Sequence, residues 1–236
     1  GPNYGKSKKN NKKILLEFVS SNPTGPLHVG HGRGAVLGMA LSNLLENSGC
    51  EVTKEYYVND AGRQISILTS SILTKAYAKD FSAEGMYEGD YIHEIAKEFL
   101  KSNEKIEIEL NSEIFSNDKE KRLDEISEYL QKNHNETWNK AKNFSITKIL
   151  DSIKEELHSF NIIHHNWFHE SSLGSIEEPA SDLSKSLSII EKADHTFSKD
   201  GAVWFKTTDF KDDKDRVLLR ENGEPTYYLT DVGYHK

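Results

Sequence analysis

Residues 14–58 constrain the fold more than any other part of this chain. The apolar run "ILLEFVS" at residues 14–20 predicts a buried central strand. The prolines in "SNPTGP" then hold the backbone out of helical geometry. A helix is predicted over about residues 28–47, and "EVTKEYYVN" predicts the next strand. Strand, helix and strand in so short a span predict a parallel unit with a right-handed crossover, and therefore an α/β, Rossmann-like start.

The predicted helix at residues 28–47 has a clear apolar pattern. Gly49 is placed to end it. The apolar residues that follow helical spacing are Val36, Leu37, Ala40, Leu41, Leu44 and Leu45.

Outside residues 14–58, the sequence pattern differs from one segment to the next. Residues 1–13 form a basic linker with a solvated lysine run, and residues 14–60 begin the core. Residues 61–160 predict a mainly helical insertion, with apolar stripes in Ile92, Ile95, Ala96, Phe99, Leu100, Ile146, Ile149, Leu150, Ile153, Leu157 and Phe160. Strand patterns return at residues 161–236, in "HNWFHE", "GAVWFKT" and "RVLLR", and the Asn-Gly pair in "ENGEP" predicts a hairpin turn. We expect these strands to join the first sheet as the second part of the core.

Composition excludes several classes of protein. The chain has 236 residues and a formal net charge of −8, so its average surface repels nucleic acid. Any binding to nucleic acid would therefore require a local basic patch. No apolar stretch is long enough to cross a bilayer, and no membrane partner is expected. The single cysteine, Cys50, cannot form an internal disulfide, which fits a reducing cytoplasm.

His28 and His31 lie on the first turn of the predicted helix. A helix N-terminus offers unpaired N–H groups and a partial positive charge, so it attracts phosphate. Gly30 and Gly34 would let a nucleotide approach the backbone closely. Histidines one turn apart share a face and can donate to phosphoryl oxygens as charge develops there. The alternative is that both are exposed residues without a role.

The stretch "PTGPLHVGH" resembles the HIGH signature of class I aminoacyl-tRNA synthetases and related nucleotidyltransferases. The longer segments "EFVSSNPTGPLHVGHGRGAVLGMAL", "YYVNDAGRQI" and "GAVWFKTTDFKDDKDRVLLRENGEPTYYLTDVGYHK" resemble bacterial arginyl-tRNA synthetases. The helical middle is similar only in outline. The residues that match the signature motif are Ser21, Asn22, Pro23, Thr24, Gly25, Pro26, Leu27, His28, Val29, Gly30 and His31.

This resemblance implies a HUP-like nucleotide-binding core and an arginine–tRNA ligase activity. Arginine would attack the α-phosphate of ATP, and the arginyl group would then pass to tRNA(Arg). ATP, accompanied by Mg2+, would be a substrate, with no tightly bound cofactor. The family also implies a cytoplasmic protein, and we expect a monomer. His28 and His31 would be catalytic, and His28, Gly30, His31 and Gly34 would bind ATP.

A cationic substrate calls for fixed carboxylates, because a carboxylate can pair with a guanidinium in a bidentate way. Glu17 interrupts an apolar strand, although an edge-strand acid facing water would look the same. Tyr227 and Asp231 would share a helix face, although an acid near a helix start is also common. The residues that the resemblance implies for arginine binding are Glu17, Ser20, Asn22, Glu170, Tyr227 and Asp231.

The histidines His164, His165 and His169 raise the hypothesis of a metal site. No second cysteine or paired acid completes a ligand set, and we expect no bound metal here.

The alternatives to a synthetase domain are an HxGH nucleotidyltransferase and a non-catalytic synthetase-like binding module. The first lacks the pattern around Asp231, and the intact His28 and His31 argue against the second. No KMSKS-like motif occurs in the chain, so we expect a catalytic-domain fragment that turns over poorly alone.

Overall fold

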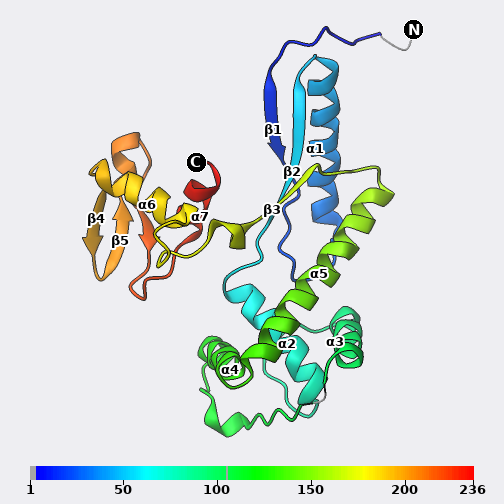
Figure 1. Ribbon diagram of the computed structural model, residues 1–236, viewed down its shortest axis with the longest axis vertical. Coiled ribbons are helices and arrows are strands. Elements are labelled where there is room, and N and C mark those ends of the chain that lie inside the picture. The colour runs from blue at the N-terminus through cyan, green and yellow to red at the C-terminus, as the bar shows by residue number, and fades with distance from the viewer. Residues whose placement is uncertain (1–3, 105) are drawn as a thin grey trace. The chain divides into compact units, whose positions relative to one another are not determined.

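The computed structural model describes residues 4–104 and 106–236 (Figure 1). Residues 1–3 of the predicted basic linker lie outside the described residues. Among the described helices, none combines the length and the apolar character that a bilayer crossing requires.

The chain begins with a strand, a helix and a second strand. These are β1 (Lys13–Glu17), α1 (Val29–Asn47) and β2 (Glu51–Val58). β1 and β2 pair in parallel, from Lys13 opposite Glu51 to Glu17 opposite Glu55, and α1 packs on both strands (Figure 1). A third strand, β3 (Asn166–His169), completes the order β1-β2-β3. The parallel strand–helix–strand prediction is therefore confirmed.

The prediction of a buried central strand at residues 14–20 is wrong. β1 lies at the edge of this sheet, β2 occupies the centre, and β1 already ends at Glu17. Lys13, Leu15 and Glu17 are exposed while the residues between them are half-buried. A strand with one solvated face alternates in this way, and the alternation is hidden in the sequence because Leu15 is apolar.

The apolar positions that follow helical spacing in α1 are largely exposed. Leu37 is 68% exposed and Leu44 is 69% exposed, and Val36 and Leu41 are exposed as well. The face that packs on the sheet consists of the small residues Ala35, Gly38 and Ser42. Small side chains permit this close approach, since a Cβ at Gly38 would overlap the ring of Phe18.

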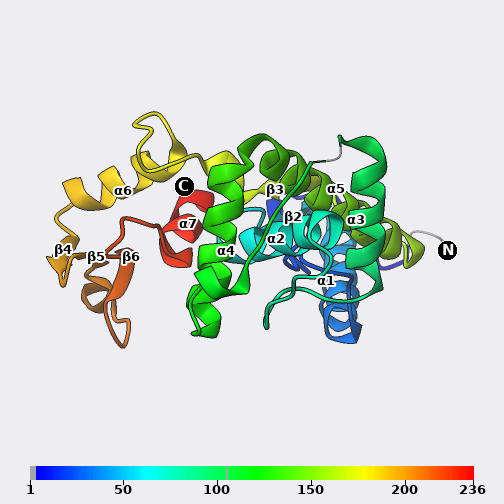
Figure 2. The same ribbon diagram turned by 90° about the horizontal axis from the view of Figure 1, so that it is seen from below.

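Residues 61–160 contain four of the seven α-helices that the structure describes. α2 (Arg63–Tyr77) packs against α3 (Asp90–Ser102), α4 (Lys119–Asn133) and α5 (Asn135–Ser159), as Figures 1 and 2 show. A short 3-10 turn, η1 (Ser112–Ile114), precedes α4. The predicted apolar stripes are buried, except that Leu100 is half-buried and Phe160, at the end of α5, is 68% exposed.

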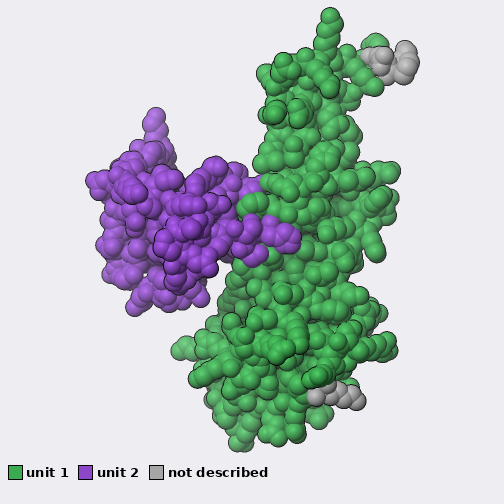
Figure 3. All heavy atoms as spheres, viewed as in Figure 1, with its two compact units in different colours: residues 1–168 green, residues 169–236 purple. Residues whose placement is uncertain are grey.

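The chain divides into two compact units, residues 1–168 and 169–236 (Figure 3). The second unit contains η2 (Glu170–Leu173), α6 (Asp182–Lys192), η3 (Thr207–Phe210) and α7 (Tyr227–Tyr234). Its strands β4 (Thr196–Lys199), β5 (Ala202–Phe205) and β6 (Arg216–Leu219) form an antiparallel sheet of their own. The expectation that all strands share one sheet is therefore wrong, because short strands joined by tight turns pair locally.

Two turns organise that antiparallel sheet. Asp200 and Gly201 both have positive φ and join β4 to β5 in a two-residue turn that was not predicted from the sequence. The predicted turn at Asn222–Gly223 does reverse the chain, but it yields only a bridge between Leu219 and Pro225 before α7 begins.

Candidate active site

The segment between β1 and α1 begins with a strained turn. Val19 has φ 72° and Ser20 has φ 43°, both in the left-handed region. A β-branched residue such as Val19 rarely adopts this conformation, and each such residue costs about 1–3 kcal/mol unless its surroundings impose it. Strain of this kind, held by the surrounding structure, is typical of functional sites.

The strained turn is held by β2. The backbone N–H of Phe18 donates to the Glu55 carbonyl at 3.3 Å, and that of Tyr57 donates to Ser20 Oγ at 3.0 Å. The Ser20 hydroxyl in turn donates to the Glu17 carboxylate. These bonds bring two predicted arginine ligands, Glu17 and Ser20, together on one side of the turn.

Asn22, the third predicted arginine ligand in this segment, is oriented by α2. Its Nδ2 donates to Gln64 Oε1 at 2.7 Å. With its amide nitrogen engaged, the Asn22 Oδ1 is left as an acceptor for a ligand N–H. No role for Gln64 was predicted from the sequence, although Gln64 belongs to the segment "YYVNDAGRQI" that carries part of the resemblance.

The remainder of the signature loop is anchored to α3. The Thr24 N–H donates to the Asn22 carbonyl at 2.8 Å, and the Tyr91 hydroxyl donates to the Thr24 carbonyl at 2.9 Å. Pro23 and Ser21 are buried, while Pro26 is exposed. The loop therefore reaches α1 along a path fixed at both ends.

His28 and His31 cap α1 reciprocally. His28 is the N-cap residue, and its Nδ1 accepts from the Gly30 N–H at 3.1 Å. His31 Nδ1 accepts from the His28 N–H at 3.2 Å, and the two rings stack with centroids 3.7 Å apart. This arrangement is a capping box in which histidines take the places usually held by Ser or Thr and Glu.

The capping bonds determine what each ring can do. An Nδ1 that accepts an N–H carries no proton, so the neutral imidazole carries its proton on Nε2. Burial, followed by the nearby His28, lowers the pKa of His31, while Glu156 opposes the shift. The pair therefore presents Nε2–H donors at the N-terminus of α1, where no acidic residue occupies the first turn.

The predicted ATP-binding glycines occupy this same turn. A Cβ at Gly30 would meet the His28 ring at 3.0 Å, so glycine there leaves room for the capping ring. No atom lies within 4 Å of a Cβ placed on Gly34, so the space beside it is open.

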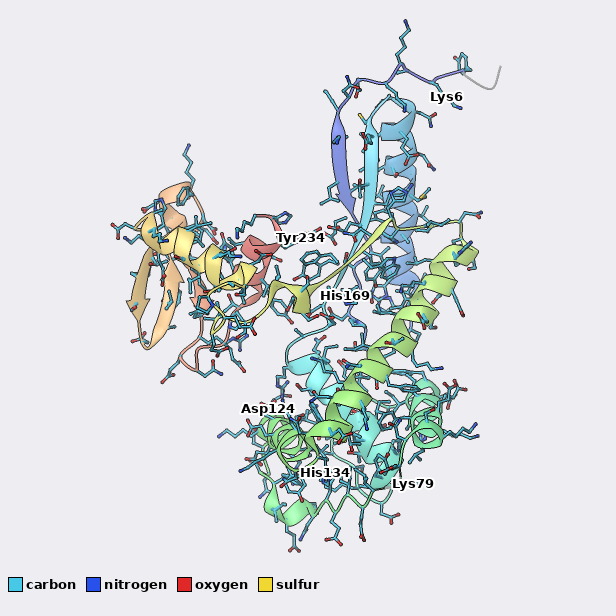
Figure 4. All side chains as sticks on the ribbon, viewed as in Figure 1. Lys6, Lys79, Asp124, His134, His169 and Tyr234 are labelled. Carbon is cyan, nitrogen blue, oxygen red and sulfur yellow. The ribbon has the colours of Figure 1, made fainter. Side chains whose placement is uncertain are left out.

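The other predicted arginine ligands belong to the unit of residues 169–236. Tyr227 and Asp231 lie one turn apart on α7, which ends at Tyr234 (Figure 4), and both are exposed. Glu170 is half-buried at the start of η2. Because Glu17, Ser20 and Asn22 lie in the other unit, a pocket that combines the two groups stays a prediction.

The histidines considered as metal ligands have separate environments. His164 is buried among aromatic rings, and His165 Nδ1 accepts from the Lys54 N–H at 3.1 Å. Within residues 4–104 and 106–236, no group of three or more His, Cys, Asp or Glu side chains could hold a metal ion.

Comparison with known proteins decides the family. The model described as "tRNA synthetases class I (R), catalytic domain" matches residues 1–236. The chain belongs to this family.

Curated relatives of this synthetase domain carry the name arginine–tRNA ligase. The protein from Psychrobacter cryohalolentis is 40% identical over 262 residues, covering 99% of this chain and 41% of its own length. That from Vesicomyosocius okutanii is 41% identical over 248 residues, covering 100% of this chain and 42% of its own length. The chain therefore spans about two fifths of these relatives.

Solved structures agree with this synthetase fold. A structure from Campylobacter jejuni, described as an arginyl-tRNA synthetase, has a TM-score of 0.74 with 31% identity, over 99% of this chain and 46% of that one. The Thermus thermophilus arginyl-tRNA synthetase has a TM-score of 0.63 with 24% identity, over 98% of this chain and 36% of that one, and it supports the fold alone.

Proposed function

We propose that this domain serves an arginine–tRNA ligase, which activates L-arginine with ATP to arginyl-adenylate and transfers the arginyl group to tRNA(Arg). The observation that carries the proposal is the reciprocal cap of α1, in which His28 and His31 keep Nδ1 engaged and Nε2–H available. The names of the curated relatives supply the specificity for arginine.

The histidine pair would act on the phosphates of ATP. When the arginine carboxylate attacks the α-phosphorus, negative charge grows on the phosphoryl oxygens and on the departing pyrophosphate. Nε2–H donors fixed by backbone bonds need no reorganisation to meet that charge. Gly30 and Gly34 would admit the nucleotide beside the first turns of α1.

Arginine would be recognised through its positive charges. In the first unit, Glu17 offers a carboxylate, and Ser20 and Asn22 offer oxygens, all fixed by the bonds described above. In the second unit, Glu170, Tyr227 and Asp231 would supply the remaining polar groups. Carboxylates suit this task because they accept paired hydrogen bonds from a planar guanidinium.

Mg2+ belongs to the proposal as the companion of ATP. Mg2+ would be held chiefly by the ATP phosphates and by water, because this ion commonly binds through substrate phosphates rather than in a cage of protein ligands. A monomeric protein acting in the cytoplasm completes the proposal.

The decisive experiment separates capping from phosphate binding at His28 in the full-length ligase. His28→Asn keeps a good N-cap oxygen but loses the Nε2–H that reaches outward. We expect arginine-dependent pyrophosphate exchange to fall on the order of a hundredfold, as for a lost transition-state donor, while arginine affinity and melting temperature change little.

A second measurement tests the amino acid. Citrulline keeps the shape of arginine but lacks its charge, so carboxylates that face it would lose their partner. Calorimetry should show arginine binding and no measurable citrulline binding. Equal binding of both compounds, or exchange in His28→Asn within about twofold of wild type, would contradict the proposed function.

A further inference from the structure

A buried histidine lies beneath the strained turn. His164 is 7% exposed, and its Nε2 lies 3.2 Å from the Phe18 carbonyl oxygen. A carbonyl only accepts, so the His164 ring carries its proton on Nε2 and donates it. The ring packs against Phe18, with centroids 4.4 Å apart, and meets Tyr56 edge-on at 5.4 Å.

This hydrogen bond lies directly before the strained turn. The Phe18 carbonyl belongs to the peptide that enters Val19 and Ser20, the residues with positive φ. The Phe18 ring is also confined by Gly38 of α1, where a Cβ would overlap it. The peptide and ring of Phe18 are thus both fixed where the chain turns toward the predicted arginine ligands.

Tyr56 gives the turn a second support from below. It is fully buried, its hydroxyl donates to the Ser21 carbonyl at 2.9 Å, and its ring stacks on Trp167 with centroids 4.3 Å apart. The carbonyls on either side of Val19 and Ser20 are therefore each held by a buried side chain.

We propose that His164 is a positioning residue for arginine recognition: through the Phe18 carbonyl it imposes the left-handed turn that aims Ser20 and Asn22 at the substrate. This inference rests on the proposed function, because it concerns the amino-acid side of the same site. His164 does not touch the substrate, and its effect passes entirely through the turn.

The surroundings keep His164 neutral for this task. Burial is the main reason that the pKa of His164 falls to about 4, with His165 and Lys54 also opposing protonation and the bond to Phe18 favouring it. Lys54 is itself paired with Glu46 at 3.1 Å. A neutral ring with its proton on Nε2 is the form that the bond requires.

The bond can be tested without any substrate. In the intact chain, nitrogen NMR of His164 should show the neutral Nε2–H form persisting at pH 5.5, where exposed histidines are mostly protonated. Finding the proton on Nδ1, or a protonated ring at that pH, would overturn the inference whether or not the protein is an arginine ligase.

Two substitutions at His164 then test positioning in the full-length ligase. His164→Phe keeps the packing but removes the donor, and His164→Gln places an amide N–H near the position of Nε2. We expect His164→Phe to raise the KM for arginine about tenfold, the effect of one hydrogen bond, with the KM for ATP unchanged. His164→Gln should restore most of the loss. Hydrogen exchange of residues 18–24 should quicken in His164→Phe and recover in His164→Gln.

A matched control separates positioning from stability. Ile126→Ala removes a fully buried side chain on α4, so it should lower the melting temperature while leaving the KM for arginine unchanged.

If His164→Phe does not fold, Tyr56→Phe, which removes only the hydroxyl bonded to Ser21, should give the same selective rise in KM. An arginine KM in the folded variant equal to that of wild type would refute the inference. If the wild-type ligase activates no amino acid, while hydrogen exchange of residues 18–24 still quickens in His164→Phe, the proposed function is refuted and the positioning of the turn is not.

Discussion

Helix α1 and the helices α3 and α5 each carry an apolar pattern in the sequence, but they bury it differently. In α3 and α5 the residues that the pattern selects, such as Ile92 and Ile153, are fully buried. In α1 the selected residues Leu37 and Leu44 are mostly exposed, and the helix packs on the sheet through Ala35, Gly38 and Ser42. Periodicity therefore identifies a face that can be covered, whereas the packing partner decides which face is covered.

The difference follows from what each helix packs against. α2–α5 surround one another, so long side chains can interdigitate in a shared core. α1 lies against a strand pair whose near surface already carries the ring of Phe18, and only small residues allow that approach. Small residues give a weak signal on hydrophobicity scales, so the face of α1 that packs on the sheet differs from the face that its large apolar residues mark.

The largest expected effect comes from making one change in both regions. Leu130→Ala removes a fully buried side chain on α4 and should lower the free energy of unfolding by about 2–5 kcal/mol. Leu44→Ala makes the identical change on α1 at a side chain that is 69% exposed, and should stay within about 0.5 kcal/mol. Urea denaturation of both variants measures the contrast. Equal losses would mean that the Leu44 face of α1 is covered.

The next effect uses the glycines of α1 as a matched pair. Gly38→Ala places a methyl group into the Phe18 ring and should destabilise the fold by about 1–3 kcal/mol, as overpacking does. Gly32→Ala meets nothing within 4 Å and should stabilise the helix by up to about 1 kcal/mol, the propensity difference between the residues. Thermal melting of the two variants should show shifts of opposite sign. A shift of the same sign in both would place the sheet-facing surface elsewhere.

A pH-dependent effect distinguishes two buried polar groups, Thr74 on α2 and His164, which packs on the Phe18 ring that α1 also contacts. In the described parts of the chain, Thr74 Oγ1 of α2 and His164 Nδ1 are buried without a hydrogen-bond partner. The pKa of His164 is about 4 in the fold and about 6.5 when unfolded, so the unfolded state binds more protons between these values. Wild type should therefore lose stability relative to His164→Phe as pH falls from 6.5 toward 4.

Thr74→Val is the control for this titration. The hydroxyl of Thr74 does not ionise, so its removal should change stability by the same amount at every pH in that window, with a gain of about 1 kcal/mol. Urea denaturation at pH 7, 6 and 5 measures both differences. If the difference in the free energy of unfolding between wild type and His164→Phe stays constant over this pH series, His164 does not titrate as described.

The smallest effect concerns the ion pairs of Arg63 at the start of α2. Asp124 lies on α4 (Figure 4). The Nε of Arg63 lies 2.6 Å from the Asp124 carboxylate, and the guanidinium also pairs with Glu120 at 2.9 Å. All of these side chains are substantially exposed, so Arg63→Ala should cost about 0.2–1 kcal/mol and less in high salt. Melting in low and high salt checks this, and a loss as large as that of Leu130→Ala would contradict it.

The sequence predicted the fold where the pattern was local. The first strand, the helix begun at His28 and the parallel partner strand could be predicted because turn residues and periodicity mark their boundaries. The separate antiparallel sheet was missed, although Asp200–Gly201 is a strong hairpin signal. The exposure of Leu37 was missed because it depends on Phe18, a residue outside the helix.

The candidate site was predicted in part for the same reason. His28 and His31 could be predicted because their spacing and their position at the start of a helix indicate a phosphate site without any knowledge of tertiary contacts. Gln64, Tyr56 and His164 could not, since each acts through a contact with a residue distant in the sequence. A histidine that holds a backbone carbonyl looks like any core histidine until its partner is seen.

The bond between His164 and Phe18 also has a consequence for the order in which the chain assembles. It joins residues 146 positions apart, with the whole of α2–α5 between them. Closing so long a loop is entropically unfavourable and slow unless the intervening helices have first drawn its ends together. We therefore expect the turn that carries the predicted arginine ligands to form late. During synthesis it can form only after residue 164 has emerged from the ribosome. Until then, Val19 and Ser20 are free to relax out of the left-handed turn.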